Sequence, residues 1–316
     1  YERHVLRRFA LVLGLFFACG EPTENPDGGV ADGGADPDAG VTPVQVRVAT
    51  YNVHLFFDTV CASGTCTSSS FEQVSTQQAF DARADQLAAA ITRLEADVVL
   101  LEEVETQACL DALTQRLAGV MPYGVLGEIG TSGSVDVAIV SRTPLFGVVG
   151  HRNLTRLERP DGSRTNFSRE FLEAHTRVSN GSEVVAFAAH FRSKSSPDDP
   201  GRRLAEAQVA RQVVQGVAAT LPDALVVMGG DLNDTPGSPP IDALTLDGGL
   251  LRAAADLPVA DQYTYIYNGQ GEAIDHLFLA ETRGARLLPR SAKVWKDGRG
   301  FAGSDHAALS ANFELR

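Results

Sequence analysis

Residues 225–236, which read Leu-Val-Val-Met-Gly-Gly-Asp-Leu-Asn-Asp-Thr-Pro, limit the possible folds of this chain more than any other segment. A short apolar run bounded by turn residues is typical of a fully buried β-strand, and its glycines permit a sharp turn and a close approach to another group. Asp231 and Asn233 are separated by one residue, so their side chains leave the strand end on the same side. A carboxylate beside an amide suits a hard metal ion and a phosphate, although an ordinary turn uses the same residue types.

The same pattern, an apolar run that ends in polar residues, recurs along the chain. A carboxylate at the end of a buried strand is costly unless it is paired or binds a cation. The recurrence therefore favours a functional site over an ordinary turn. Helices are predicted near 71–96 and over 202–221, where apolar residues have helical spacing. The strand-end residues are Asn52 after 44–51, Glu102 and Glu103 after 97–101, His190 after 183–189, Asp275 and His276 within 273–280, and Asp305 and His306 before the final strand over 308–315.

Composition limits the number of domains and the class of partner. The chain has 316 residues, of which 44% are hydrophobic. That is enough for a large core, in one domain of about 250–270 residues with an extension. The net charge of -13 excludes a general nucleic-acid-binding protein, which needs a basic domain or face. A phosphate-bearing substrate must therefore meet a local basic patch or a bound cation.

The first residues have the character of an export signal. Arginines form a basic start, and the apolar run over 9–18 is of signal-peptide length and too short to span a bilayer comfortably. The run ends just before Cys19, in a pattern that resembles a bacterial lipoprotein signal with Cys19 as the lipidated residue. Ordinary secretion with cleavage near Ala18 is the alternative. The sequence thus predicts a lipoprotein-type signal peptide over 1–19.

Residues 20–45 are rich in Gly, Asp and Pro and carry almost no large apolar side chain, so we expect a disordered acidic tether. Cysteine usage agrees with export, because Cys61 and Cys66 bracket a short loop that a disulfide could close in an oxidising compartment. We therefore expect an exported protein, either a periplasmic or outer-membrane lipoprotein held to the membrane by its lipid, or a cell-surface or secreted one.

Taken together, the polar motifs follow one another in a recognisable order: Asn52, Leu101-Glu102-Glu103, His190, Gly230-Asp231-Leu232-Asn233, Ile274-Asp275-His276 and Ser304-Asp305-His306. In this order the chain resembles the endonuclease/exonuclease/phosphatase superfamily, the DNase I-like fold, over residues 46–316. The resemblance implies an α/β (α+β) catalytic domain built as a four-layer α/β/β/α sandwich, in which helices flank two packed mixed β-sheets. It also implies phosphoester hydrolysis that depends on Mg²⁺ or Mn²⁺, with Ca²⁺ as a further candidate.

The resemblance implies metal ligands at three positions. Glu103 matches the family's metal carboxylate, Asn52 matches an amide that helps to position metal or phosphate, and Asp305 matches a further carboxylate near the metal. Mg²⁺ prefers oxygen ligands, few protein carboxylates and retained waters, so one principal glutamate is a sensible arrangement. Glu102 stands where relatives usually have glutamine, and it is the weaker candidate.

The resemblance also implies the catalytic residues. Asp231 and Asn233 match the pair that orients the attacking water and holds the phosphate. His306 matches the site histidine, and Asp275 matches the carboxylate that fixes its tautomer. His190 matches a second histidine, which protonates the leaving oxygen or stabilises charge on the phosphate.

Basic residues near the predicted strand ends are candidates for phosphate contacts, because the arginine fork matches phosphate with two hydrogen bonds. The alternative is a solvated surface position, the usual fate of arginine and lysine. The candidates are Arg142, Arg169, Arg192 and Lys194.

The substrate is less constrained, because the same fold carries nucleases, inositol-phosphate phosphatases and sphingomyelinases. We predict an exported endonuclease or exonuclease of DNA or RNA, because residues 189–194 and 263–269 resemble segments of secreted bacterial nucleases. Exposed tyrosines in the second segment can stack bases. The alternatives are a phospholipid, sphingomyelin or small-phosphoester hydrolase, which a membrane tether would suit, and an inactive binding module. We expect a monomer.

Overall fold

The computed structural model describes residues 43–154 and 156–316. The predicted signal peptide over 1–19, the predicted lipidation at Cys19 and most of the predicted tether over 20–45 lie outside the described residues. Strand β1 (Val44–Phe56) already includes the last two residues of that tether. The regular structure therefore begins at the first residue of the strand predicted over 44–51, inside the last two residues assigned to the tether.

The first of two large sheets contains seven strands. They are β1, β2 (Val98–Val104), β3 (Tyr123–Gly127), β4 (Asp136–Ser141), β15 (Ala285–Leu287), β16 (Lys293–Trp295) and β17 (Ala308–Leu315). Their order is β15-β17-β1-β2-β4-β3, with β16 paired to β17. Strands β1 and β2 run parallel, whereas β4 is antiparallel to β2. The carboxyl ends of β1 and β2 therefore lie at the same edge of this sheet.

The second large sheet contains six strands in the order β11-β14-β10-β9-β8-β5. They are β5 (Phe146–Gly150), β8 (Leu172–Arg177), β9 (Glu183–His190), β10 (Leu225–Asp231), β11 (Leu251–Arg252) and β14 (Asp275–Leu279). Parallel pairing of β9 with β10 places His190 directly beside Asp231, and antiparallel pairing with β14 places Asp275 on the other side of Asp231. Two small hairpins join β6 (Leu157–Glu158) to β7 (Arg164–Thr165) and β12 (Tyr265–Tyr267) to β13 (Gln270–Glu272).

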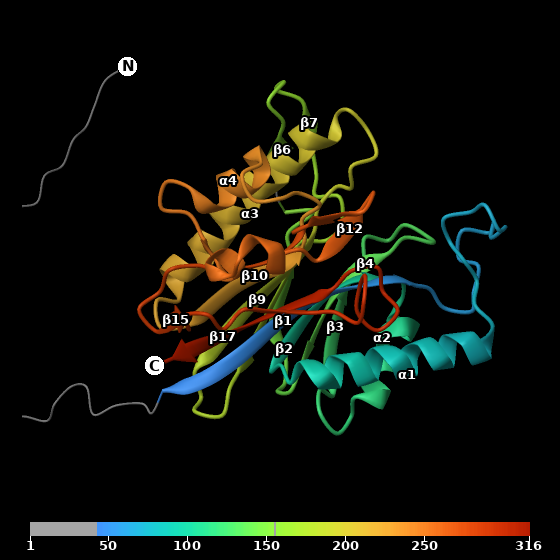
Figure 1. Cartoon of the computed structure of the whole chain (residues 1–316), viewed down its shortest axis with the longest axis horizontal. Coiled ribbons are helices and arrows are strands. Elements are labelled where there is room, and N and C mark those ends of the chain that lie inside the picture. The colour runs from blue at the N-terminus through green and yellow to red at the C-terminus, as the bar shows by residue number, and fades with distance from the viewer. Residues whose placement is uncertain (1–42, 155) are drawn as a thin grey trace, which may run out of the picture. The chain divides into compact units, whose positions relative to one another are not determined.

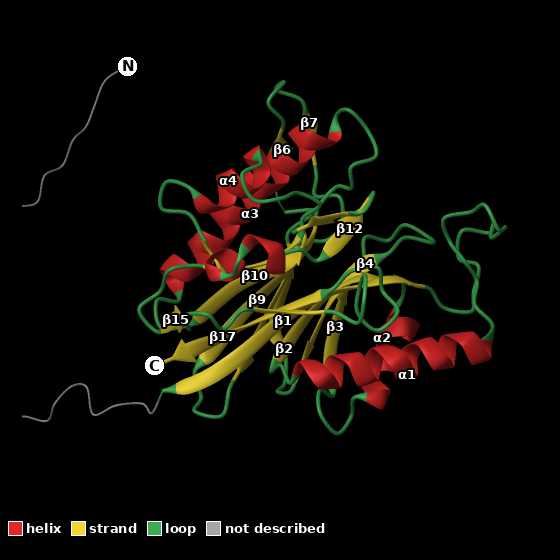
Figure 2. Ribbon diagram, viewed as in Figure 1, coloured by secondary structure: helices red, strands yellow, loops and turns green. Residues whose placement is uncertain are grey.

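Helices cover the outer face of each sheet (Figures 1 and 2). Helices α1 (Gln77–Leu94) and α2 (Gln107–Arg116) pack on the first sheet, and α3 (Asp199–Thr220) and α4 (Pro239–Thr245) pack on the second. Two short 3-10 helices, η1 (Ala253–Asp256) and η2 (Val259–Asp261), follow β11. The predicted four-layer α/β/β/α arrangement is confirmed.

Burial on both faces explains why the central strands read as continuous apolar runs. In β10, Leu225 and Val227 belong to the apolar cluster between the sheets, whereas Val226 and Met228 belong to the cluster beneath α3 and α4. Successive side chains of a strand point to opposite faces, so one run fills two layers of core.

Helix α1 is shorter than the helix predicted over 71–96. Thr76 caps it, and the Thr76 Oγ1 accepts a hydrogen bond from the Ala79 amide at 3.2 Å. Such a cap satisfies an amide that the helix itself cannot bond, so residues 71–75 belong to the preceding loop. Within the described residues, no helix combines the length and the apolar character needed to cross a bilayer.

Candidate active site

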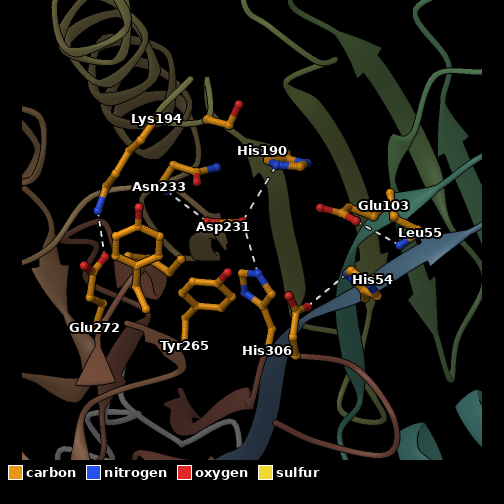
Figure 3. Close-up of a pocket in the computed structure, with 14 residues that line it drawn as sticks. His54, Leu55, Glu103, His190, Lys194, Asp231, Asn233, Tyr265, Glu272 and His306 are labelled. Carbon is orange, nitrogen blue, oxygen red and sulfur yellow. Dashed lines mark hydrogen bonds and ion pairs between the residues drawn. The ribbon is translucent and has the colours of Figure 1, made fainter. Parts of the chain in front are cut away.

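The polar strand ends of the two sheets meet around one cavity of about 390 Å³. Figure 3 shows Glu103 from β2, His190 and Asp231 from the second sheet, and His306 from the segment before β17 pointing toward one another. The parallel pairs β1–β2 and β9–β10 explain the convergence, because both pairs end at this edge.

Gly230 fixes the position of Asp231. Its φ is 146°, and a Cβ at this residue would lie 1.7 Å from the Ala189 carbonyl oxygen in β9. Only glycine tolerates both the backbone conformation and the close approach. The glycine therefore allows β10 to deliver Asp231 beside His190 without displacing the neighbouring strand.

Asp231 is buried at the centre of the cavity. Its Oδ2 accepts a hydrogen bond from Asn52 Nδ2 at 3.1 Å, and its Oδ1 accepts one from the Asn233 amide at 2.9 Å. The ring nitrogens His190 Nε2 and His306 Nε2 lie 3.7 and 3.9 Å from Oδ2. Burial raises the pKa of Asp231 to about 7, against the opposing charge of His306. A carboxylate with such a pKa is suited to accept a proton near neutral pH.

Glu103, rather than its neighbour Glu102, faces the cavity. The pairing of β2 shifts register between Glu102 and Val104, and Glu103 takes a left-handed φ of 69°. Its Oε1 accepts a hydrogen bond from Asn52 Nδ2 at 3.1 Å, and its Oε2 accepts one from the Leu55 amide at 2.8 Å. These donors fix the carboxylate while leaving lone pairs free on both oxygens.

Glu102 is instead buried between the sheets. Its Oε1 accepts a hydrogen bond from Thr50 Oγ1 at 2.9 Å, whereas its Oε2 has no partner among the described residues. Burial, together with the charges of Asp275 and Asp231, raises the pKa of Glu102 well above its usual value. We infer that Glu102 is a neutral acid behind the site.

His306 and Asp275 form a hydrogen-bonded pair. The His306 Nδ1 donates to the Asp275 carboxylate, with distances of 2.9 and 3.2 Å to the two oxygens. Burial alone would lower the pKa of His306, but the charges of Asp275, Asp231 and Asp305 overcome it and raise the pKa to about 10. His306 is therefore an imidazolium at neutral pH, with its Nε2 directed toward Asp231.

Two hydroxyl groups hold this pair in place. Thr264 Oγ1 accepts a hydrogen bond from the Asp275 amide at 3.1 Å, and Ser304 Oγ accepts one from the His306 amide at 3.0 Å. Ser304 Oγ also donates to the Asn52 carbonyl oxygen at 2.8 Å. Such supporting bonds orient the groups that do the chemistry.

His190 has the opposite protonation state. Burial, followed by the positive charges of Arg169 and His306, holds the pKa of His190 well below its usual value. Its Nδ1 is buried without a hydrogen-bond partner among the described residues. The site therefore contains one charged and one neutral imidazole on either side of Asp231.

The predicted metal ligand Asp305 lies at the cavity wall but is engaged with His54. Its Oδ1 lies 3.0 Å from His54 Nδ1, and both side chains are nearly half exposed. The hydrogen bond that His54 donates to Asp305 raises the pKa of His54. An ion at Asp305 would have to compete with this pair, whereas Glu103 and Asn52 have no basic partner in the structure's hydrogen-bond network.

The basic residues are distributed differently from the prediction. Lys194 alone among the four candidates lines the cavity, where its Nζ pairs with Glu272 at 2.7 Å (Figure 3). Arg169 lies behind the wall and donates from Nε to the Val135 carbonyl oxygen at 2.6 Å. The Arg192 guanidinium turns away to Asp199, with an Nε–Oδ1 distance of 2.8 Å.

Arg142 requires a correction. It follows β4, which is antiparallel to β2, so Ser141 pairs with Val98 at the start of β2 while Glu102 at its end pairs with Val137. The Arg142 Nε donates to the Ala96 carbonyl oxygen at 2.8 Å. Arg142 therefore lies at the opposite edge of the sheet and cannot meet a phosphate held beside Glu103.

The hairpin β12–β13 brings to the cavity two of the tyrosines that we expected to stack bases, together with Glu272, which the sequence did not single out. The Tyr265 ring packs against His306 with 4.8 Å between ring centroids, and Tyr267 and Glu272 also line the cavity. The turn residues Asn268 and Gly269 both have positive φ, of 48° and 81°. Asn-Gly between two β-forming runs is a strong hairpin signal. This signal could have predicted the hairpin that carries these side chains.

The pair Cys61–Cys66 is joined by a disulfide with an S–S distance of 2.02 Å. This disulfide closes a loop in the segment that joins β1 to α1. The loop follows Leu55, which lines the cavity. Cys109 is buried and not bonded to another cysteine.

The oxygen donors suit a hard divalent ion. Glu103 presents carboxylate oxygens beside Asp231 in a cavity that is open to solvent, whereas Asn52 turns its Nδ2 toward both carboxylates and its Oδ1 accepts a hydrogen bond from the His54 amide. Mg²⁺ and Mn²⁺ favour oxygen ligands with retained water. Asp231, Asp275 and His306 also have ligand atoms within 4.8 Å of one another. Because the His306 Nδ1 already carries the proton donated to Asp275, we interpret this group as a proton-bearing triad.

Comparisons with known proteins agree with this geometry. A family model described as the Endonuclease/Exonuclease/phosphatase family matches residues 49–306. TDP2 from C. elegans has a TM-score of 0.60 at 17% identity, covering 85% of this chain and 75% of that one. An endonuclease/exonuclease/phosphatase from Bacteroides vulgatus gives 0.59 at 17%, covering 86% and 100%.

A structure of D. rerio TDP2 complexed with single strand DNA product gives a TM-score of 0.58 at 18% identity, covering 85% of this chain and 98% of that one. At these identities, the likeness to solved structures shows a shared fold. A search of curated protein sequences found no match.

Proposed function

The chain belongs to the endonuclease/exonuclease/phosphatase family, and from its site we propose that it is a divalent-metal-dependent phosphodiesterase that cleaves nucleic acid. The observation that carries this proposal is the buried Asp231, whose pKa of about 7 lies between the shifted pKa values of the neutral His190 and the charged His306. When the environments of neighbouring titratable groups shift their pKa values in opposite directions, one group can act as an acid and another as a base.

Each residue has a role that follows from its state. Asp231 accepts the proton of the attacking water, and the Asn233 amide fixes the orientation of its carboxylate. The His306 imidazolium stabilises the negative charge that develops on the phosphate oxygens. Neutral His190 contributes its Nε2 to the same wall of the cavity.

Enzymes of this family depend on a divalent metal, and Glu103 would hold it here, with its carboxylate oriented by the Asn52 Nδ2. When bound, such an ion neutralises charge on the phosphoryl oxygens. Asp305 would join the ligands only by leaving His54. Lys194 is the described basic side chain best placed to meet the substrate backbone, because it lines the cavity.

Two observations support nucleic acid as the substrate. Tyr265 and Tyr267 form an aromatic wall, and aromatic rings bind single-stranded bases by stacking. The D. rerio TDP2 structure is described as a complex with single strand DNA product. The acidic net charge of -13 disfavours an extended duplex interface, so we propose a single strand or a chain end as the substrate.

Phospholipid hydrolysis is the second candidate, and one observation favours it. The loop between β1 and α1 exposes Val60, Phe71 and Val74, which are 61%, 56% and 45% accessible. Exposed apolar side chains of this kind can enter a lipid interface.

We also propose that the protein is exported as a lipoprotein anchored through Cys19. The basic start and the apolar run support it, as does a disulfide, which persists in oxidising compartments. The test is the cell fraction of wild type and Cys19→Ser together with intact mass. We expect membrane association that the substitution abolishes, and an unmodified N-terminus upstream of Cys19 would contradict the proposal.

The proposed activity is tested with the purified protein and Mg²⁺ on single-stranded DNA, duplex DNA, RNA, sphingomyelin and phosphomonoesters. We expect cleavage of single-stranded nucleic acid that Asp231→Asn abolishes, while the matched surface variant Asp223→Asn retains it. Asp223 is exposed and pairs with Arg283. Hydrolysis of sphingomyelin alone would establish the second candidate, and no hydrolysis of any substrate would leave a binding module.

A further inference from the structure

The disulfide-closed loop between β1 and α1 is built on three buried carboxylates. Asp58, Glu72 and Glu105 are only 8%, 3% and 4% accessible. In the described part of the chain, none of them forms an ion pair with a lysine, arginine or histidine. Buried charges without a partner are costly, and proteins normally pair them or use them to bind metal ions.

Hydrogen-bond donors hold two of these carboxylates in position. Asp58 Oδ2 accepts a hydrogen bond from Thr106 Oγ1 at 2.9 Å. Glu72 accepts bonds from the amides of Ala62 at 2.5 Å and Ser63 at 2.8 Å. Bonds to the charged form favour it, and each carboxylate oxygen keeps a second lone pair.

Glu105 stands at the centre of the group with an unsatisfied oxygen. Its Oε2 accepts a hydrogen bond from the Asp58 amide at 2.8 Å, whereas its Oε1 is fully buried without a partner among the described residues. Asp58, Glu105 and Cys109 have ligand atoms within 4.8 Å of one another. The cluster therefore lacks a positive charge.

We propose that Asp58, Glu72 and Glu105 hold a structural Ca²⁺ ion at the base of the disulfide-closed loop, distinct from the catalytic metal. Ca²⁺ accepts carboxylate ligands in irregular geometry, whereas Mg²⁺ demands a regular octahedron and keeps several waters, for which a buried cluster has little room. Zn²⁺ would need the Cys109 thiolate. The Cys109 Sγ instead donates to the Phe56 carbonyl oxygen at 3.2 Å, and burial raises its pKa to about 11.

The position of this ion links it to the catalytic site. Glu105 follows Glu103 by two residues, and Asp58 follows Leu55, whose amide holds the Glu103 carboxylate. The ion would therefore fasten the loop to the ends of β1 and β2 that set the position of Glu103.

The test uses thermal melts of the full chain with its disulfide intact, first in EDTA and then with about 1 mM CaCl₂, a concentration in the range of extracellular Ca²⁺ modules. Melts are made in a Glu103→Ala background, which removes the catalytic metal ligand. With a Kd of about 0.1 mM this is a tenfold excess, and we expect Ca²⁺ to raise Tm by about 3–6 °C. Glu105→Gln should abolish this rise.

The EDTA arm separates a metal ligand from a merely structural acid. Without Ca²⁺, Glu105→Gln should melt no lower than its parent, because the neutral amide removes repulsion from Asp58 and Glu72. The control Glu206→Gln changes a fully buried carboxylate that accepts bonds from the amides of Ser168 and Arg192. It should lower Tm equally in EDTA and in Ca²⁺.

Equilibrium dialysis keeps the proposal testable if Glu105→Gln does not fold. The Glu103→Ala protein should bind one Ca²⁺ per chain, and Asp58→Asn in that background should bind none. No bound Ca²⁺ in the Glu103→Ala protein would overturn the proposal, as would a Ca²⁺ effect that persists in Glu105→Gln. A greater stabilisation by Mg²⁺ or Zn²⁺ at equal concentration would also overturn it.

Discussion

Replacing Asp275 by asparagine should remove the group that keeps His306 charged. The His306 ring is 2.9 Å from the nearer Asp275 oxygen, and both side chains are buried. Asparagine preserves the shape of the side chain but not its charge. Burial then prevails, and the pKa of His306 should fall toward or below its usual 6.5.

The expected magnitude follows from the pKa. A value of about 10 in place of 6.5 corresponds to about 5 kcal/mol in favour of the imidazolium, at ~1.4 kcal/mol for each tenfold change. Asp275, Asp231 and Asp305 share this stabilisation. Loss of one charge-stabilising donor in an active site costs about 10²–10³-fold in kcat, and we expect Asp275→Asn to lose this amount at neutral pH.

The pH dependence gives a sharper signature. Wild-type kcat should rise with pH as Asp231 loses its proton and fall at higher pH as His306 loses its proton; without metal the pKa values of these groups are about 7 and about 10. In Asp275→Asn the pKa of His306 should fall below that of Asp231. The pH range in which Asp231 is ionised and His306 is charged, where wild-type kcat is constant, then disappears. A bound divalent cation lowers the pKa of both groups, and the two proteins are therefore compared at the same metal concentration.

The assay is kcat against pH for Asp275→Asn, His306→Ala and the double variant on the best substrate, with thermal melts alongside. Residues that act as one unit lose similar activity singly and together, so the double variant should be no worse than His306→Ala. Additive losses in proteins that melt like wild type would refute the pairing, as would an unchanged wild-type plateau in Asp275→Asn.

Other perturbations have equally definite outcomes. EDTA should abolish hydrolysis, and Glu103→Ala should lower kcat by about 10²-fold or more with an unchanged melt; activity that survives both would remove the metal from the mechanism. Gly230→Ala should destabilise the fold by about 3 kcal/mol in urea titration, because its Cβ would lie 1.7 Å from the Ala189 carbonyl oxygen; a wild-type midpoint would contradict the packing argument. In β8, burial would raise the pKa of Glu173, but the hydrogen bonds from two histidines lower it to about 2, and the hydrogen bond to Glu173 raises the pKa of His175. The stability from Glu173 is present above its usual 4.5 and lost as pH falls toward about 2, while that from His175 is present below its usual 6.5 and lost as pH rises through its raised pKa. Melts of Glu173→Gln should lose this pH dependence, and an unaltered profile would refute it.

The strand ends that build the site could be predicted from the sequence, because apolar runs bounded by glycine and polar residues mark buried strands. Asp231 and His190 each end a strand, as their patterns indicated, and the structure shows that the two strands are adjacent and parallel. The layering and the partnership of His306 with Asp275 came from the resemblance to a known family, since residues 31 positions apart have no local signal that joins them.

Other features depend on tertiary geometry that a pattern does not carry. Two adjacent glutamates alternate across a strand, and the register shift at Glu103 decides which one faces the cavity. An arginine after a strand reaches the site only if that strand runs the right way, and β4 carries Arg142 to the far edge. Arg192 follows a correctly placed strand, yet its ion pair with Asp199 turns it away.

Cleavage of bis(p-nitrophenyl) phosphate tests the account most directly, because an activated diester requires no recognition of a particular natural substrate. The rate is measured after EDTA treatment and after restoration of Mg²⁺ or Mn²⁺, for wild type, Asp231→Asn and Asp223→Asn. We predict metal-restored release of p-nitrophenol in wild type and Asp223→Asn, and a rate lower by about 10²–10⁴-fold in Asp231→Asn with an unchanged melt. Equal rates in well-folded wild type and Asp231→Asn would contradict the assignment of this site as a metal-dependent phosphodiesterase centre.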